Sequence, residues 1–195
     1  KALGHKFTKY VSDNNATTTK DGTKTARCDN GCGTKNTVVD KGSKKTNPSQ
    51  SPKIKIGQKL QNSVGVRCAI TGKNTAECIG YVGKKNSVTI PPSLKYMGVT
   101  YQITSIKTKA FSGNKNLRSI VIPSSIRTIG SQAFFKCKNL KKITIKTPYL
   151  SKKTVGAKAF KGIHAKAKIK VPKKQKKAYQ KLLKAKGAGK KVTIK

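Results

Sequence analysis

One arrangement of apolar residues occurs three times in the second half of the chain. Each copy begins with an Ala-Phe pair, continues with a Leu or Ile a few positions later, and ends in a short stretch where apolar and polar residues alternate. The second pair follows the first after 23 residues, and the third follows the second after 26. The pairs are Ala110-Phe111, Ala133-Phe134 and Ala159-Phe160. A repeat this short cannot enclose a hydrophobic core alone, so the pattern predicts copies that stack on one another.

The alternating stretches that end the copies predict strands. Residues two positions apart on a strand share a face, so each stretch presents apolar side chains to one side and polar ones to the other. The apolar positions are Ile120, Ile122, Ile143, Ile145, Ile169 and Val171. We expect one strand and one short helical or irregular turn per repeat. Together they predict an α/β-type solenoid, mainly β, over residues 102–172.

Both ends of such a stack expose the core unless another element covers them. Residues 54–101 are rich in β-strand patterns and are expected to form the N-terminal cap. A hairpin that turns at residues 72–74 would place Cys68 opposite Cys78, close to the Cβ separation that a disulfide needs. Either a disulfide or two packed thiols fits this arrangement. At the other end, residues 173–195 predict a C-terminal cap made of a helix and a final strand.

The first part of the chain has a different pattern. Residues 1–45 contain turn signals such as Asp21-Gly22 and a short β-strand pattern, which predict a small, cysteine-containing β module. Residues 46–53 contain two prolines, two serines and no large apolar side chain, as expected for a linker. Because the first residue is a lysine, we expect the chain to be a mature or excised part of a longer protein.

The repeats resemble the BspA-like leucine-rich repeat, also called the Treponema pallidum type. The pattern I-x-x-I-x-x-x-A-F-x-x-[N/C]-x-x-L-x-x-I-x-I-P carries the resemblance, and residues 103–123 and 126–145 match it closely. The third copy departs from it in its spacing and in its lysine-rich strand. Residues 1–45 resemble a short tandem module of surface proteins of anaerobic Gram-positive bacteria, with the pattern G-H-x-F-x-x-Y-V-S-D-x-N-A-T. The resemblance implies a bacterial cell-surface protein used for adhesion or ligand binding, without catalytic residues.

Charge is the second prominent property of the chain. It carries 45 basic residues against 5 acidic ones, which gives a net charge of +40. All the aspartates lie in the first 40 positions, and Glu77 is the single acidic residue after them. Such an excess of positive charge favours attraction to polyanions. All but four of the basic residues are lysines. Because arginine is the favoured reader of bases, nucleic acid is not the expected partner.

The lysines acquire an order if the sheet has an open face. The outward positions of successive repeats would then align in rows across the strands, with Lys142, Lys168 and Lys191 in one row and Lys170 in the next. Neighbouring strands lie about 4.8 Å apart, so these ammonium groups would form a ladder suited to the repeating charges of a polyanion. The alternative is a solvated polar face without a specific ligand.

Two cysteines and a histidine in the first module are candidate metal ligands. A structural zinc site needs four ligands, and the module offers His5, Cys28 and Cys32. The usual form of the module that this segment resembles carries a C-x-x-C pair and a further upstream cysteine, where this sequence has Thr18 or Thr19. A local disulfide and unpaired thiols are the other interpretations of Cys28 and Cys32. We expect no metal or other cofactor.

The chain lacks the groups that common catalytic mechanisms need. His5 and His164 are its two histidines, and no acidic residue lies near His164 in the sequence to orient it. No stretch approaches the length of about 18 apolar residues that predicts a membrane span. We therefore expect a non-catalytic, exported module for adhesion or binding, located outside the cell or on the cell wall. Its ligand would be a protein, a glycan or an anionic wall polymer such as teichoic acid. The alternative is a structural spacer or targeting domain of a larger exported protein.

Overall fold

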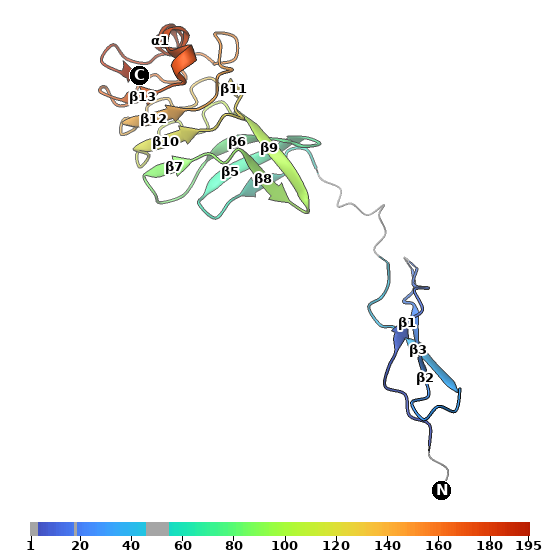
Figure 1. The fold of residues 1–195 in the computed structure, drawn as a ribbon. Coiled ribbons are helices and arrows are strands. Elements are labelled where there is room, and N and C mark those ends of the chain that lie inside the picture. The colour runs from blue at the N-terminus through green and yellow to red at the C-terminus, as the bar shows by residue number, and fades with distance from the viewer. Residues whose placement is uncertain (1–3, 18, 46–54) are drawn as a thin grey trace. The chain divides into compact units, whose positions relative to one another are not determined.

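The chain divides into two compact units, Lys1–Lys53 and Ile54–Lys195, in a computed structural model (Figure 1). Residues 4–17, 19–45 and 55–195 are described by the structure. The linker predicted at residues 46–53 lies outside these described residues. Each unit has its own sheets, so the two are treated separately.

The first unit contains a small antiparallel sheet in the order β1-β2-β3. Its strands are β1 (Val11–Ser12), β2 (Thr23–Arg27) and β3 (Lys35–Val39). Two of the five residues of β2 are threonines, whose β-branched side chains suit a pleated, half-exposed surface. Among its described residues, the buried apolar side chains are Ala16, Ala26 and Cys28. Apolar burial therefore contributes little to the stability of this sheet.

A five-stranded parallel sheet carries the repeats of the second unit, in the order β14-β13-β12-β10-β7. The strands are β7 (Ser87–Thr89), β10 (Ser119–Ile122), β12 (Lys142–Ile145), β13 (Lys168–Lys170) and β14 (Thr193–Ile194). The predicted strand face is confirmed, because Ile120 pairs with Ile143, which pairs with Ile169, and all three are buried. Figure 1 shows these strands one above the other at one side of the unit.

The three phenylalanines of the Ala-Phe pairs stack in the interior of the second unit. The ring centroids of Phe111 and Phe134 lie 5.2 Å apart, those of Phe134 and Phe160 lie 5.5 Å apart, and all three rings are buried. The backbone repeats with them, since Phe111 N–H donates to the Ala133 carbonyl and Phe134 N–H to the Ala159 carbonyl, each at 2.8 Å. One apolar cluster extends from Val66 to Ile194. Successive repeats therefore share a single core.

A second, mixed sheet precedes the stack, in the order β11-β9-β6-β5-β4, with β8 paired to β9. Its strands are β4 (Lys59–Gln61), β5 (Val66–Gly72), β6 (Thr75–Tyr81), β8 (Ser93–Tyr96), β9 (Val99–Ile106) and β11 (Thr128–Ile129). The hairpin of β8 and β9 was not anticipated from the sequence. It turns at Met97 and Gly98, whose φ angles of 49° and 76° are those of a tight two-residue hairpin loop.

The stack ends in a short 3₁₀ helix, Lys173–Gln175, and the helix α1, Lys176–Ala185. Tyr179, Leu182 and Leu183 are the buried residues of α1. The hydroxyl of Tyr179 donates to the Thr147 carbonyl at 2.8 Å and accepts from the Leu150 N–H at 3.0 Å. Within the described residues, no helix combines the length and the apolar character required to cross a membrane.

Candidate functional site

The outer face of the five-stranded sheet carries the predicted lysine rows. Lys142 on β12 pairs in register with Lys168 on β13, and Thr144 pairs with Lys170. All three lysines are exposed, whereas the isoleucines between them point into the core. The strand register therefore places three ammonium-bearing side chains on two neighbouring strands of one face.

The prediction that Lys191 continues the first row is wrong. Thr193 lies beside Lys168 in that row, because β14 starts two residues later than the sequence pattern suggested. Lys191 belongs to the turn before β14, where Val192 N–H donates to the Gly189 carbonyl at 3.0 Å. Backbone hydrogen bonds define this register, since Thr193 N–H donates to the Ala167 carbonyl at 2.9 Å and Lys195 N–H donates to the Ile169 carbonyl at 3.0 Å.

Lys195 takes a place in the second row that the sequence analysis missed. Its N–H donates to the Ile169 carbonyl at 3.0 Å, and its carbonyl accepts from Val171 N–H at 2.9 Å. In a parallel ladder these two bonds bracket the partner residue, so Lys195 lies beside Lys170. The exposed basic group on this face is therefore Lys142, Lys168, Lys170 and Lys195, called the lysine face below.

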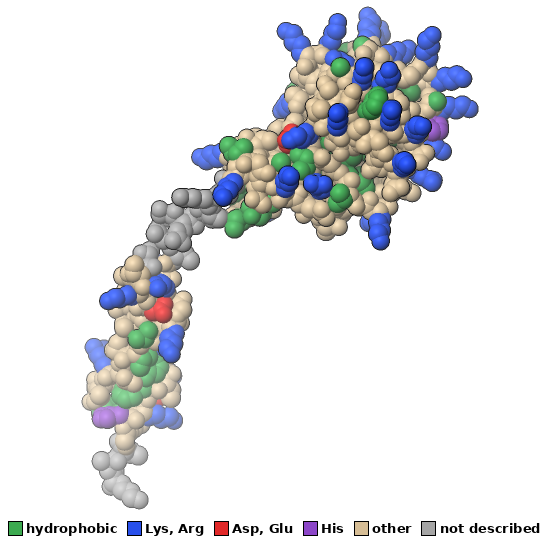
Figure 2. Space-filling model, turned by 180° about the vertical axis from the view of Figure 1, so that it is seen from behind, with side chains coloured by type: hydrophobic (Ala, Val, Ile, Leu, Met, Phe, Trp, Pro, Cys, Tyr) green, Lys and Arg blue, Asp and Glu red, His purple; other side chains and the backbone are tan. Residues whose placement is uncertain are grey.

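Little negative charge balances the lysine face. Glu77 is the sole acidic residue after position 40, and its carboxylate pairs with Lys107 at 3.2 Å. Among the described residues, the remaining ion pair joins Lys24 to Asp40 in the first unit. Figure 2 shows Lys and Arg side chains projecting over much of the visible surface of the second unit. Charge alone thus does not single out the lysine face; its distinction is the strand register.

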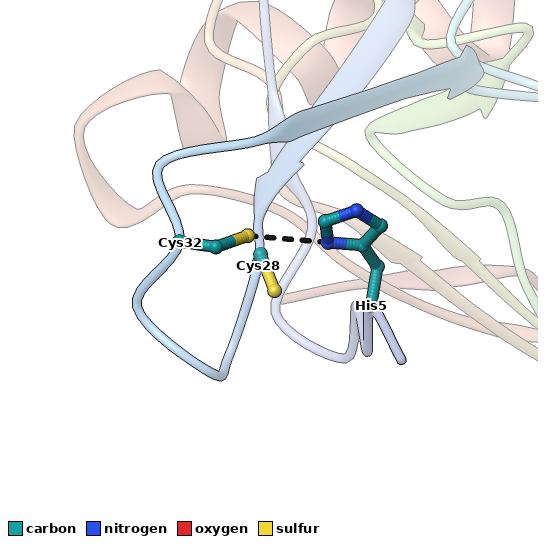
Figure 3. Close-up of side chains that lie close together, drawn as sticks. All are labelled: His5, Cys28 and Cys32. Carbon is teal, nitrogen blue, oxygen red and sulfur yellow. Dashed lines mark hydrogen bonds between the residues drawn. The ribbon is translucent and has the colours of Figure 1, made fainter. Parts of the chain in front are cut away.

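Three metal-ligating side chains meet in the first unit. One ligand atom from each of His5, Cys28 and Cys32 lies within 4.8 Å of the others (Figure 3). The Nδ1 atom of His5 is 3.1 Å from Sγ of Cys32, which is also 3.3 Å from Oγ1 of Thr34. Cys28 directly follows β2 and is buried, whereas His5 and Cys32 are exposed. The sequence predicted this set of residues, and the structure brings all three together.

The surroundings of Cys28 favour its thiolate. A hydrogen bond from the His5 side chain, together with the backbone of Lys6 and the thiol of Cys32, lowers the pKa of Cys28 to about 6. Hydrogen bonds to the charged form stabilise it relative to the neutral thiol. A thiolate is both the nucleophilic and the metal-binding form of cysteine. Cys28 therefore has a larger thiolate fraction than an ordinary cysteine.

Cys68 and Cys78 are register partners on β5 and β6, as predicted. Both are buried, and both are thiols in this structure. The hairpin loop is one residue shorter than expected, because Gly72 pairs with Thr75, and a β-bulge restores the cysteine register. A hydrogen bond with Cys68, followed by burial, raises the pKa of Cys78. The disulfide between them stays a prediction, which counting of alkylated thiols in the isolated protein can test.

Cys137 has a structural environment. Its thiol donates to the Phe111 carbonyl at 2.9 Å, and burial raises its pKa to about 11. Asn114, at the same position in the preceding repeat, accepts backbone N–H groups from Asn116 and Leu117. Both side chains thus serve the backbone of a repeat turn, one as donor and the other as acceptor.

An apolar cleft between β4 and β8 was not anticipated from the sequence. It has a volume of about 430 Å³, and its walls include Leu60, Val66, Leu94 and Tyr96. Gln61, Asn62, Ser93 and Lys95 add polar groups to a lining that is apolar in its larger part.

Comparison with known proteins identifies the repeats. The family model described as the BspA type leucine rich repeat region matches residues 91–195, in six copies. No curated protein matches the chain. At both ends the match extends beyond residues 102–172, the range in which the sequence showed three copies.

Several solved bacterial structures align with part of the chain. A leucine rich cell surface protein from Faecalibacterium prausnitzii A2-165 has a TM-score of 0.47 and 22% identity, over 60% of this chain and 37% of its own. A leucine-rich repeat protein from Bacteroides capillosus has a TM-score of 0.47 and 18% identity, over 70% of this chain and 98% of its own. A third, from Bacteroides ovatus, has a TM-score of 0.42 and 25% identity, over 67% and 36%. The chain thus spans little more than a third of the Faecalibacterium protein.

The stacked phenylalanines, the parallel sheet and the family match agree on one assignment. The family match covers more than half of the 195 residues and coincides with the stack that the structure shows. The chain therefore belongs to the BspA-type leucine-rich repeat family.

Proposed function

We propose that the second unit is a non-catalytic binding module of a bacterial surface, and that its repeats form a short solenoid whose lysine face binds anionic polymers. The observation that carries this proposal is the strand register of Lys142 with Lys168 and of Thr144 with Lys170. Register fixes the spacing of the ammonium groups across the sheet, which a random scatter of lysines would not. The proposal places the chain in contact with extracellular or cell-wall polymers.

The geometry suits a polymer with regularly spaced charges. Parallel strands lie about 4.8 Å apart, so the lysine face offers cations at a short, repeated interval across β12, β13 and β14. An isolated exposed lysine contributes little to binding, because water and salt screen it. Several such contacts along one polymer add up through the release of counterions, which makes the binding strongly salt-dependent. Wall polymers of linked phosphates and sulfated host glycans both present such charges.

Nucleic acid fits this surface less well than a phosphate or sulfate polymer. Single-stranded nucleic acids bind on exposed aromatic platforms, and the exposed aromatic side chain of the second unit is Tyr149. The guanidinium of Arg127 lies over that ring, 3.5 Å from its centroid, and occupies the face on which a base would stack. The lysine face itself contains no arginine for bidentate contacts to bases.

A triple substitution tests the proposal directly. Changing Lys142, Lys168 and Lys170 to Gln removes three charges from the lysine face and leaves the buried isoleucines untouched. We expect the slope of log affinity against log salt to fall by about one for each lysine that contacts the polymer. The measurement is a binding titration with poly(glycerol phosphate) in one arm and heparin in the other, which separates a wall polymer from a host glycan.

The matched control changes Lys174, Lys177 and Lys181 to Gln. These residues lie at the C-terminal end of the stack and are exposed, so the control removes the same charge from another surface. The control variant should retain the slope of the unaltered protein. If the slope of log affinity against log salt falls equally in the two variants, diffuse charge and not the lysine face causes the binding. Absence of binding in both arms would favour the structural spacer or targeting domain.

A further inference from the structure

The first unit has too small a core to be stable through apolar burial alone. Its buried apolar side chains among residues 4–17 and 19–45 are Ala16, Ala26 and Cys28, none of them large. Units of about 40 residues usually need a disulfide, a metal or a partner to fold, because they bury too little surface. A cross-link within this unit is therefore expected on physical grounds.

Hydrogen bonds already bring the start of the described chain against the loop that follows β2. Asp29 N–H donates to the Lys6 carbonyl at 2.8 Å, and Asn30 Nδ2 donates to the Gly4 carbonyl at 2.7 Å. The hydroxyl of Thr8 donates to the Asp29 carboxylate at 2.8 Å. These bonds hold His5 beside Cys28 and Cys32, although the histidine lies far from both in the sequence.

We propose that His5, Cys28 and Cys32 bind a thiophilic divalent cation of the zinc class, and that this ion cross-links the first unit. Zinc lies about 2.3 Å from cysteine sulfur and about 2.0–2.1 Å from histidine nitrogen, which sets tetrahedral ligand atoms roughly 3.5–3.8 Å apart. The three ligand atoms lie within 4.8 Å of one another, so small rotations of the exposed side chains complete the site (Figure 3). Binding releases the thiol protons to solvent as the two thiolates coordinate the ion.

A metal accounts for this arrangement better than a disulfide. A bond between Cys28 and Cys32 would close a loop of only a few residues, which constrains the unfolded chain little. It would also leave His5 without a role, although its Nδ1 atom faces Sγ of Cys32 at 3.1 Å. An ion held by all three residues joins the chain before β1 to the loop between β2 and β3. The chain segment closed by such an ion is much longer than the one closed by a Cys28–Cys32 disulfide, so the ion stabilises the unit more than the disulfide would.

The site leaves the fourth zinc position open. Structural zinc sites are usually closed by four protein ligands, so the three ligands present here leave one position for water or for another donor. Two of the three ligands, His5 and Cys32, are exposed, so the open position faces solvent. We therefore expect a site that a strong chelator empties readily, and that accepts a donor atom from another molecule.

Cobalt(II), which reports on thiolate ligands through its absorption, tests the site in the full chain under reducing conditions. The expected result is binding of one ion per chain with a thiolate-to-cobalt charge-transfer band, and displacement of cobalt by zinc. His5→Ala and Cys32→Ser change exposed residues and leave the buried Cys28 in place, and each should weaken binding at least about 10-fold. His164→Ala, which removes the other histidine, is the matched control and should bind as the unaltered protein does.

The same titration contains the results that overturn the proposal. Binding that survives both His5→Ala and Cys32→Ser would assign the ion to other residues, such as Cys68 and Cys78. Absence of a charge-transfer band in the reduced protein would exclude a thiolate site altogether. The third result concerns the protein as isolated, without a reductant. If Cys28 and Cys32 then fail to react with an alkylating reagent, a disulfide joins them in place of the metal.

Discussion

The two units of this chain solve the same problem of stability in different ways. In the second unit one apolar cluster extends from Val66 to Ile194, and each repeat buries its phenylalanine against that of its neighbour. The first unit buries Ala16, Ala26 and Cys28 among its described residues. Repeats can be short because they share a core, whereas the first unit buries few apolar side chains of its own and depends more on polar links.

Hydrogen bonds between polar side chains connect the strands and turns of the first unit, whereas apolar contacts connect those of the second. The hydroxyls of Thr23 and Thr25 both donate to the Asp13 carboxylate, at 2.7 and 2.9 Å, and Asn15 pairs with Thr23. Such bonds are exposed and each contributes little net stability. In the second unit the core stabilises the fold, which leaves the outward positions of β12 and β13 free to carry lysines.

The largest effect is expected when the shared core of the second unit is interrupted. Phe134→Ala removes the middle ring of the stack and leaves a cavity between Phe111 and Phe160, which should lower the free energy of unfolding by about 3–5 kcal/mol. Phe135→Ala, at the adjacent and only half-buried position, is the matched control and should cost clearly less. Denaturant unfolding checks both, and equal losses would contradict a core that depends on stacked rings.

A smaller effect is expected where two repeats approach each other through their backbones. A Cβ added at Gly156 would overlap the backbone nitrogen of Ser131 in the preceding repeat. Gly156→Ala should therefore push the repeats apart and lower the free energy of unfolding by about 1–3 kcal/mol. Gly189→Ala, whose Cβ meets only open space and Val192, should have little effect. A neutral Gly156→Ala variant would show that the repeats can move apart without loss of packing.

The smallest predicted effect concerns a single hydroxyl that ties α1 to the stack. Tyr179→Phe keeps the buried ring but leaves the Thr147 carbonyl and the Leu150 N–H without their partner, which should cost about 1–2 kcal/mol. Tyr149→Phe, at an exposed ring, is the control and should change the free energy of unfolding by less than about 0.5 kcal/mol.

The same hydroxyl predicts a difference in pH dependence. Burial raises the pKa of Tyr179 in the folded protein. As pH rises above about 10, the tyrosine therefore ionises first in the unfolded state, and this ionisation favours unfolding. The stability that this hydroxyl contributes is complete at lower pH and is lost as pH passes through the raised pKa. The free energy of unfolding, measured across this pH range, should therefore fall more steeply for the unaltered protein than for Tyr179→Phe. Parallel curves for the two proteins would contradict this assignment.

The sequence predicted the features that repetition determines. Alternation within each copy was enough to assign Ile120, Ile143 and Ile169 to one buried face and Lys142 and Lys168 to the opposite one. The predictions were less accurate at the C-terminal end of the stack. In the final strand Thr193, not Lys191, lies beside Lys168. A shift of two residues keeps Val192 and Ile194 on the buried face, so alternation could not distinguish the two registers.

Long-range geometry explains what else the sequence left open in both units. Spacing alone identified Cys28 and Cys32 as candidate ligands with His5, but their distance depends on how the segment before β1 lies against the loop after β2. The hairpin at Met97 and Gly98 depends on two left-handed backbone conformations, one of them at a non-glycine residue that gives no turn signal. The metal-ligand cluster thus depends on a contact between distant segments, and the hairpin depends on a backbone conformation that its residue types do not specify.

The central claim is that one continuous core supports all repeats of the second unit independently of the first. Hydrogen exchange of backbone amides in the full chain, compared between the unaltered protein and Phe134→Ala, tests it most directly. The account predicts that amides of β10, β12 and β13 lose protection together, while those of β2 and β3 exchange at unchanged rates. Loss of protection confined to β12, or shared with β2 and β3, would contradict it.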